Sequence, residues 1–160
     1  MTVAVIRHAA LEGQDHYIVR QLAEEICRGL RSKDYISEAI AIYNFVLART
    51  RYMRDPRTTE LIRAPHVVCR ELLAGKTPNL DCDDMTALIL ALLLATGCSC
   101  AAVTVAFKNM VHAGQQQYSH VFAQAYEPRT GTLLVLDPVA NVNIPQMLSR
   151  VVVAKVWPVA

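Results

Sequence analysis

A cysteine, a histidine and an aspartate in this sequence have the types and settings that nucleophilic chemistry needs. Cys82 lies in the segment LDCDDM, His120 in SHVFAQAY and Asp137 in LLVLDPVA. A thiol is activated by an adjacent base, and a histidine base is in turn oriented by a third group such as a carboxylate. The three residues are therefore candidates for a Cys-His-Asp triad that forms a thioester intermediate.

The residues around Cys82 predict the start of a helix. Asp81 is a suitable N-cap and Asp84 stands where a capping-box acid belongs, so Cys82 is expected to be the first helical residue. The exposed N–H groups and partial positive charge of a helix N-terminus favour a thiolate. The carboxylates of Asp81, Asp83 and Asp84 act against this by raising the thiol pKa. Cys82 therefore needs a proton-accepting partner, for which His120 is the candidate.

Two predicted strands bring His120 and Asp137 together. Tyr118–Tyr126 and Thr132–Leu136 are rich in β-forming residues, and the segment between them has the proline and glycine of a hairpin turn. Folding the hairpin about Arg129 places position 138 opposite His120. A shift of one residue in the turn then brings Asp137 within side-chain reach of the imidazole.

The rest of the chain is divided by hydrophobic periodicity into helices followed by strands. Helices first and antiparallel strands afterwards predict an α+β fold. With 160 residues, of which 53% are hydrophobic, we expect one domain over residues 1–160. The predicted helices are Asp15 to about Leu30, Asp34 to Met53 (stopped by Asp55-Pro56), His66–Ala74 and Cys82–Gly97, and the remaining predicted strands are Ser99–Phe107 and Val151–Trp157, with a loop at Lys108–Gln117.

Composition argues against several other classes of protein. The formal charge of +2 is spread along the chain, which disfavours a nucleic-acid or membrane partner. The apolar run Met85–Ala95 is shorter than the roughly 20 residues of a membrane span, and the N-terminus lacks a secretory signal, so we expect a cytoplasmic protein. Five cysteines, an odd number, argue against a disulfide framework. Cys98 and Cys100 form a lone C-x-C without a second ligand pair, so no metal is expected.

The segment LDCDDMTALILALLLATGCSCAAVTV resembles the nucleophile helix and first strand of the transglutaminase-like superfamily. SHVFAQAY resembles the strand that carries the family's histidine, and LLVLDPVA the strand that ends in its Asp-Pro. The resemblance is clear over residues 78–139 and weaker over 35–75. Leu80 and Phe122 depart from the family, which usually has Gly and often Trp at these positions.

The resemblance implies a papain-like α+β fold with its core at about residues 35–140, in which the nucleophile helix packs on a C-terminal antiparallel sheet. It also implies a catalytic triad of Cys82, His120 and Asp137, without a cofactor. Tyr52 is the candidate side-chain donor for the oxyanion, because an aromatic residue upstream of the cysteine often has this role in the family. The expected substrate is a peptide or protein, and hydrolysis is favoured because water needs no second binding site. Protein-glutamine cross-linking and deamidation use the same intermediate and stay open.

A non-catalytic interaction module is the alternative of another class. In that interpretation the fold is kept and a basic rim binds an acidic partner or nucleic acid. Such a face is more often simply solvated, and no aromatic platform for single strands accompanies it. The rim would consist of Arg49, Arg51, Arg54, Arg57 and Arg63.

Overall fold

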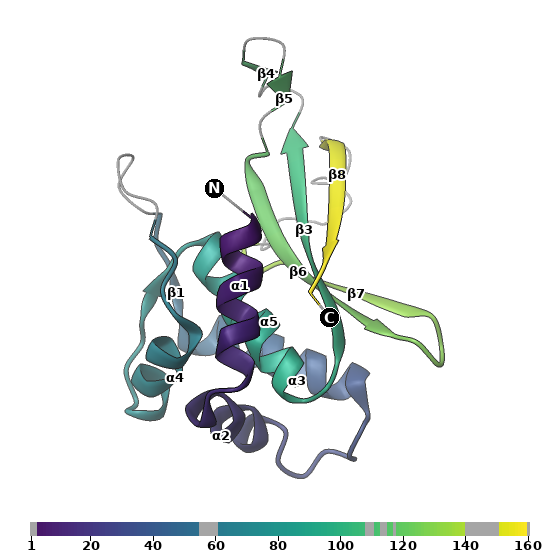
Figure 1. Ribbon diagram of the computed structural model, residues 1–160. Helices are drawn as coiled ribbons and strands as arrows, with labels where there is room; N and C mark the ends of the chain where they lie inside the picture. The colour runs from purple at the N-terminus through teal and green to yellow at the C-terminus, as the bar shows by residue number, and fades with distance from the viewer. Residues whose placement is uncertain are drawn as a thin grey trace.

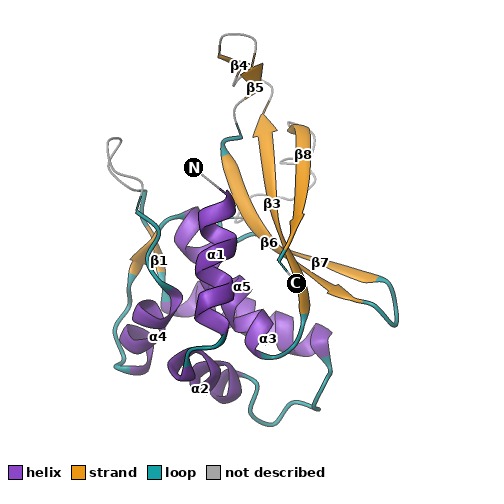
Figure 2. Ribbon diagram, viewed as in Figure 1, coloured by secondary structure: helices purple, strands orange, loops and turns teal. Residues whose placement is uncertain are grey.

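The computed structural model describes residues 3–54, 61–107, 111–112, 115–116, 118–139 and 151–159. In this part of the chain the helices gather on one side and the main sheet lies on the other (Figures 1 and 2). The helices are α1 (Val3–Gln14), α2 (Tyr17–Ile26), α3 (Tyr35–Arg49), α4 (Pro65–Leu73) and α5 (Cys82–Ala95).

Helix α5 is the centre of the helical layer. Every residue from Asp83 to Leu94 is buried, because the sequence of this helix is apolar on nearly every side. The other four described helices all contact it, and α1 runs alongside it (Figure 1). The helix that begins at Cys82 is thereby held by all the other described helices.

The main sheet is antiparallel, with strand order β7-β6-β3-β8. Strands β6 and β3 pack against α5. Two short pairs lie outside this sheet: a parallel pair, β1 with β2, and an antiparallel pair, β4 with β5. The strands are β1 (Arg51–Tyr52), β2 (Asn79–Leu80), β3 (Ser99–Phe107), β4 (Val111–His112), β5 (Gln115–Gln116), β6 (His120–Glu127), β7 (Thr132–Leu136) and β8 (Val151–Pro158).

Strand β6 is packed on both of its faces. Val121 and Ala123 belong to the main core with α5, whereas Phe122 packs with Val103 and Val105 in a smaller cluster. This alternation follows from the two-residue period of a strand. The packing makes β6 a firm support for His120, its first residue.

Several predicted elements are confirmed by the structure. Asp34 caps α3, because its carboxylate accepts the Ser37 N–H at 3.2 Å, and Asp81 caps α5. The strands Ser99–Phe107 and Thr132–Leu136 have the predicted bounds. The other predicted strands, the helix at His66–Ala74 and the end of the helix at Gly97 are displaced by one or two residues.

The N-terminal half differs from the prediction in three places. The helix expected from Asp15 to Leu30 is the shorter α2, and α1 before it was not predicted at all. The helix expected to reach Met53 ends at Arg49, because the following backbone enters β1: the Arg51 N–H donates to the Pro78 carbonyl at 3.0 Å. The proposed stop at positions 55–56 lies outside the described residues, as do parts of the loop expected at 108–117.

The failure to predict α1 has a structural reason. Apart from Ile6, its buried positions are the small residues Ala10 and Gly13, which give a weak hydrophobic pattern. A Cβ atom at Gly13 would lie 3.0 Å from the Pro65 side chain and 3.2 Å from that of Ala91. Close approach to α4 and α5, rather than an apolar stripe, therefore fixes α1.

Candidate active site

Cys82 is the first residue of α5, as the sequence predicts. The Asp81 carboxylate accepts the N–H groups of Asp83 and Asp84, each at 3.0 Å, and so starts the helix immediately before the cysteine. The Asp84 carboxylate accepts the Arg63 N–H at 2.7 Å. This bond ties the segment preceding α4 to the first turn of α5.

The Cys82 thiol is half-buried and donates a hydrogen bond to Oδ1 of Asp83 at 3.3 Å. Burial raises its pKa far above the usual thiol value, and the carboxylates of Asp83 and Asp81 raise it further. The backbone N–H of Val121 acts in the opposite direction. In this arrangement the thiol is protonated at neutral pH, because burial and the acidic neighbours together outweigh the helix N-terminus.

His120 and Asp137 form a close pair. His120 Nε2 lies 2.8 Å from Asp137 Oδ2, and the two side chains are only 12% and 1% exposed. The ladder between β6 and β7 ends at Ala123 opposite Leu136. Continuing this register puts Asp137 opposite Phe122, so the expected register was wrong by one residue. Asp137 instead lies diagonally from His120, on the same face of the sheet.

The position of Asp137 is fixed by two further hydrogen bonds. Its Oδ1 accepts the Val139 N–H at 3.0 Å, and its backbone carbonyl accepts the Tyr43 hydroxyl at 2.7 Å. Tyr43 comes from α3, and the sequence did not single it out as a site residue. No local pattern could have revealed its contact, since Tyr43 and Asp137 are 94 residues apart.

The first turn of α5 is bonded to β6 beside His120. The Thr86 hydroxyl donates to the Val121 carbonyl at 3.3 Å. The backbone N–H of Val121 interacts with the Cys82 sulfur and lowers the thiol pKa. Because Nε2 of His120 is turned to Asp137, Nδ1 is the ring nitrogen left to accept a proton. The junction of α5 and β6 thus brings the nucleophile candidate next to the strand that carries the base candidate.

Tyr52 lies on β1, next to the segment that leads into Cys82. It pairs with Leu80 and is 42% exposed, while the Leu80 side chain is buried in the core. Arg54 lies two residues beyond the end of β1, as Cys82 lies two residues beyond the end of β2. A hydrogen bond to Tyr52 raises the pKa of the Arg54 guanidinium, and the thiol of Cys82 adds to that effect. Arg54 was grouped in the sequence with the basic rim and not with the site.

Besides Arg54, two arginines of the proposed rim are engaged by the protein itself. Arg63 pairs with Glu71 at 2.7 Å. Arg49 donates to the Leu72 carbonyl at 3.5 Å and lies over the Phe45 ring. Arg57 is outside the described residues, and Arg51 and Arg54 are exposed on or beside β1.

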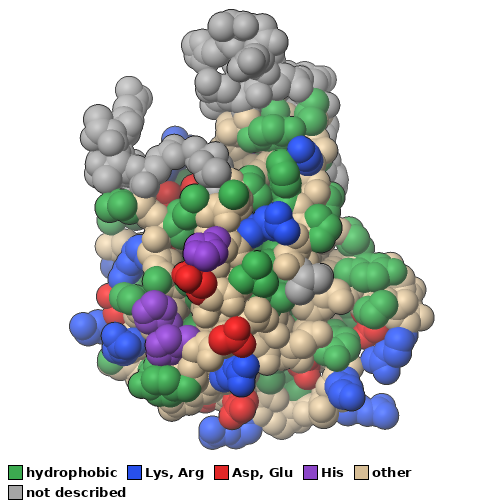
Figure 3. All heavy atoms as spheres, viewed as in Figure 1, with side chains coloured by type: hydrophobic (Ala, Val, Ile, Leu, Met, Phe, Trp, Pro, Cys, Tyr) green, Lys and Arg blue, Asp and Glu red, His purple; other side chains and the backbone are tan. Residues whose placement is uncertain are grey.

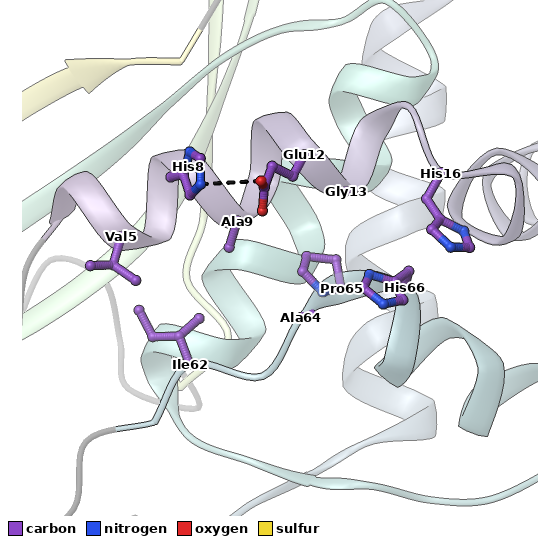
Figure 4. Close-up of a pocket in the computed structure, with 10 residues that line it drawn as sticks. All are labelled: Val5, His8, Ala9, Glu12, Gly13, His16, Ile62, Ala64, Pro65 and His66. Carbon is purple, nitrogen blue, oxygen red and sulfur yellow. Dashed lines mark ion pairs between the residues drawn. The ribbon is translucent and has the colours of Figure 1, made fainter.

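A second group of titratable side chains lines a pocket of about 420 Å³ between α1 and residues 62–66 (Figure 4). The rings of His16 and His66 are stacked, with centroids 4.5 Å apart. His8 lies 3.2 Å from Glu12 on α1, and histidines gather on this face of the molecule (Figure 3). Among the described residues, no group of three or more His, Cys, Asp or Glu side chains is arranged to hold a metal ion.

Over the part of the chain that the structure describes, the helices are too short or too polar to cross a membrane.

Comparison with known proteins gives likeness in structure only. No family model matches the chain, and no curated protein matches its sequence. A candidate protease from Parabacteroides distasonis is similar with a TM-score of 0.59 and 13% identity, over 84% of this chain and 26% of that protein. A candidate cysteine protease from Cytophaga hutchinsonii has a TM-score of 0.54 and 15% identity, over 87% of this chain and 45% of that one.

LapG of Legionella pneumophila matches over more of its length. The TM-score is 0.53 at 15% identity, covering 99% of this chain and 88% of LapG. This chain therefore spans less than half of each of the two candidate proteases and most of LapG. At these identities the likeness establishes the fold. The predicted class is confirmed: an α+β, papain-like fold in which the helix that begins at Cys82 packs on an antiparallel sheet.

Proposed function

We propose that the protein is a cysteine-nucleophile hydrolase that cleaves peptide or carboxamide bonds through a thioester. One observation carries the proposal: the His120–Asp137 pair, at 2.8 Å, is formed by the first residue of β6 and the residue that follows β7, and β6 is bonded through Thr86 to the helix that begins at Cys82. Cys82 is the nucleophile, His120 the base and Asp137 the group that orients the imidazole.

The reaction begins when the thiol leaves Asp83 and turns to Nδ1 of His120. Nδ1 takes the thiol proton, and the negative charge of Asp137 stabilises the imidazolium that results. The thiolate then attacks the substrate carbonyl carbon. The Cys82 thiol is therefore protonated while it faces Asp83 and becomes a thiolate only after it has turned to His120.

The tetrahedral intermediate has a negative oxygen, which needs hydrogen-bond donors. The Cys82 backbone N–H at the helix N-terminus is one donor, and the Tyr52 hydroxyl on β1 is the second. Collapse of the intermediate breaks the C–N bond, and His120 returns its proton to the departing amine. Water, deprotonated by His120, then hydrolyses the thioester and restores the Cys82 thiol.

The similar structures support this class of reaction, because two of them are candidate proteases and one of those is a candidate cysteine protease. The expected substrate is an extended peptide segment or a side-chain carboxamide. Hydrolysis is favoured over transfer to an amine, because water needs no second binding site.

Alkylation by iodoacetamide near neutral pH, mapped by mass spectrometry over the five cysteines, tests the nucleophile. Cys69, Cys98 and Cys100 are buried, which leaves Cys27 as the competitor of Cys82. Burial raises the pKa of Cys27 to about 11, a smaller rise than that of Cys82. If the Cys82 thiol stays bonded to Asp83, it should therefore react more slowly than Cys27. If His120 accepts its proton, Cys82 should react first.

We expect Cys82 to be labelled first, and His120→Asn to slow its labelling while that of Cys27 is unchanged. Faster labelling of any other cysteine in the wild-type protein would remove Cys82 as the nucleophile. Trapping of the acyl-enzyme from a peptide library, followed by addition of a primary amine, then separates hydrolysis from cross-linking. A product that contains the amine would replace the hydrolase by a transglutaminase.

A further inference from the structure

Asp137 precedes a proline, and three hydrogen bonds hold it in place. The residue before a proline is restricted to extended backbone conformations, and Pro138 has no N–H with which to fix the next peptide. The Asp137 side chain is 1% exposed and uses its two oxygens for His120 and Val139. The backbone carbonyl between these groups is held by one side chain from another element, the Tyr43 hydroxyl at 2.7 Å.

Tyr43 is a firm donor for this bond. Helix α3, which carries it, packs against both α5 and β6. The Tyr43 ring is partly buried against the main core. Burial raises the pKa of its phenol, and the Asp137 charge contributes, so the hydroxyl keeps its proton throughout the neutral range. The bond therefore couples the last residue of the proposed triad to the element that flanks the first.

We propose that Tyr43 is a positioning residue for the Asp137–His120 pair, a role that rests on the proposed cysteine-hydrolase function. By holding the Asp137 carbonyl, the Tyr43 hydroxyl fixes the peptide from which the carboxylate projects and keeps Oδ2 aimed at Nε2 of His120. Without the hydroxyl, the peptide turns and the imidazolium loses its partner. Displacements of about 1 Å far from the reacting atoms cost up to about a hundredfold in rate.

The test is Tyr43→Phe, which keeps the ring and removes the hydroxyl. Tyr35→Phe is the matched control, because Tyr35 lies on the same helix and also packs partly buried against the core. The rate of Cys82 alkylation is measured as a function of pH, a readout that needs no substrate. We expect Tyr43→Phe to move the alkylation profile to higher pH and to slow labelling at pH 7 about tenfold, with Tyr35→Phe unchanged.

Once a substrate is identified, we expect Tyr43→Phe to lower turnover by about ten- to a hundredfold, with little change in KM. The double variant Tyr43→Phe/Asp137→Asn tests whether Tyr43 acts through Asp137. If it does, Tyr43→Phe should lower turnover little further when Asp137 is already Asn. Equal losses in both backgrounds would assign the hydroxyl to general stability instead. So would a Tyr43→Phe protein that melts at a lower temperature while its folded fraction is alkylated normally.

The outcomes separate the two proposals. If Cys82 of the wild-type protein is not selectively labelled, the proposed function fails. If wild-type Cys82 is labelled selectively and Tyr43→Phe has the same pH profile, the function stands and the positioning role of Tyr43 is overturned.

Discussion

Histidines and carboxylates lie together in two regions of the molecule: the junction of α5 with β6 and β7, and the pocket between α1 and α4. At the junction, the carboxylate of Asp137 is 1% exposed and faces His120 at 2.8 Å. In the pocket, His8 and Glu12 lie 3.2 Å apart, but their side chains are 71% and 70% exposed. The two regions thus share their residue types and differ in how tightly these residues are held.

The difference lies in the origin of the contacts. Asp137 is bonded to residues 17 and 94 positions away in the sequence, so three separate elements meet on it. In the pocket, the His16 ring accepts a hydrogen bond from Ile18, two residues away, and Glu12 is four residues from His8. The stacking of His16 on His66 joins distant segments, but through half-buried rings rather than a buried charge. Convergence of distant elements on a buried charge, rather than the presence of titratable groups, distinguishes the candidate active site.

The largest effects are expected at the junction, where Asp137→Asn tests whether the buried charge is used in catalysis. The side-chain shape is kept and the negative charge is lost, so His120 becomes a weaker base or takes the wrong tautomer. The analogous change in a serine-protease triad lowers turnover by about 10⁴. We expect a smaller but severe loss here, because a thiol ionises with less help than a hydroxyl. Turnover and melting temperature are measured together.

Cys82→Ala is the companion variant, because it removes the nucleophile and leaves the pair intact. It should abolish the acyl-enzyme and leave the melting temperature nearly unchanged or slightly higher, since it removes a thiol flanked by carboxylates. Full activity in Asp137→Asn, or unfolding of either variant, would mean that these residues are structural.

Local sequence signals predicted much of the junction. Asp81 before Cys82 carries the capping signal, and the strands on either side of Arg129 carry the hairpin signal. The register was missed by one residue because Gly131, with φ of 69°, belongs to the turn and leaves Glu127 paired with Thr132. Positions 133–136 of β7 are all apolar, so either register places apolar side chains on the core face and the sequence could not decide between them.

The contacts that the sequence could not predict are those made over long separations or by orientation. The periodicity of α3 is satisfied whether Tyr43 packs as an aromatic ring or also donates its hydroxyl. Cys82 lies beside acids in the sequence, but only the structure shows that its thiol is directed at Asp83. Side-chain direction at a helix terminus depends on what packs around it, and here that is β6, which follows more than 30 residues later.

A second prediction sharpens the comparison by changing the resting state of the thiol. Asp83→Asn removes the nearest charge that raises the Cys82 pKa and leaves a side chain of the same shape. A lower pKa means more thiolate at pH 7, by about tenfold for each unit, offset in part by the lower nucleophilicity of a weaker base. We expect alkylation at pH 7 to be several-fold faster than in the wild-type protein.

Asp84→Asn is the matched control for Asp83→Asn, since Oδ1 of Asp84 accepts the Arg63 N–H. Its Cys82 alkylation rate should stay near that of the wild-type protein. A slower Cys82 in Asp83→Asn would show that Asp83 assists the thiol instead of holding it in a protonated state.

The smallest effect is expected in the pocket, where His66 should influence stability and not catalysis. Burial lowers the pKa of His66, and the neighbouring His16 and Arg70 lower it further, while Glu12 opposes them. The folded state therefore binds the His66 proton less tightly than the unfolded state, in which the pKa is about 6.5. Stability is complete above that value and declines as the pH falls toward the folded pKa. His66→Gln removes this loss, so its melting temperature should decline slightly less than that of the wild-type protein between pH 7.5 and 5.5. Val67→Thr, a change without a titrating group one residue further along α4, should follow the wild-type curve.

If His66→Gln also followed the wild-type curve, the stacked histidines would have no part in the acid sensitivity of the fold. If His66→Gln lowered the labelling of Cys82, the pocket and the junction would be coupled.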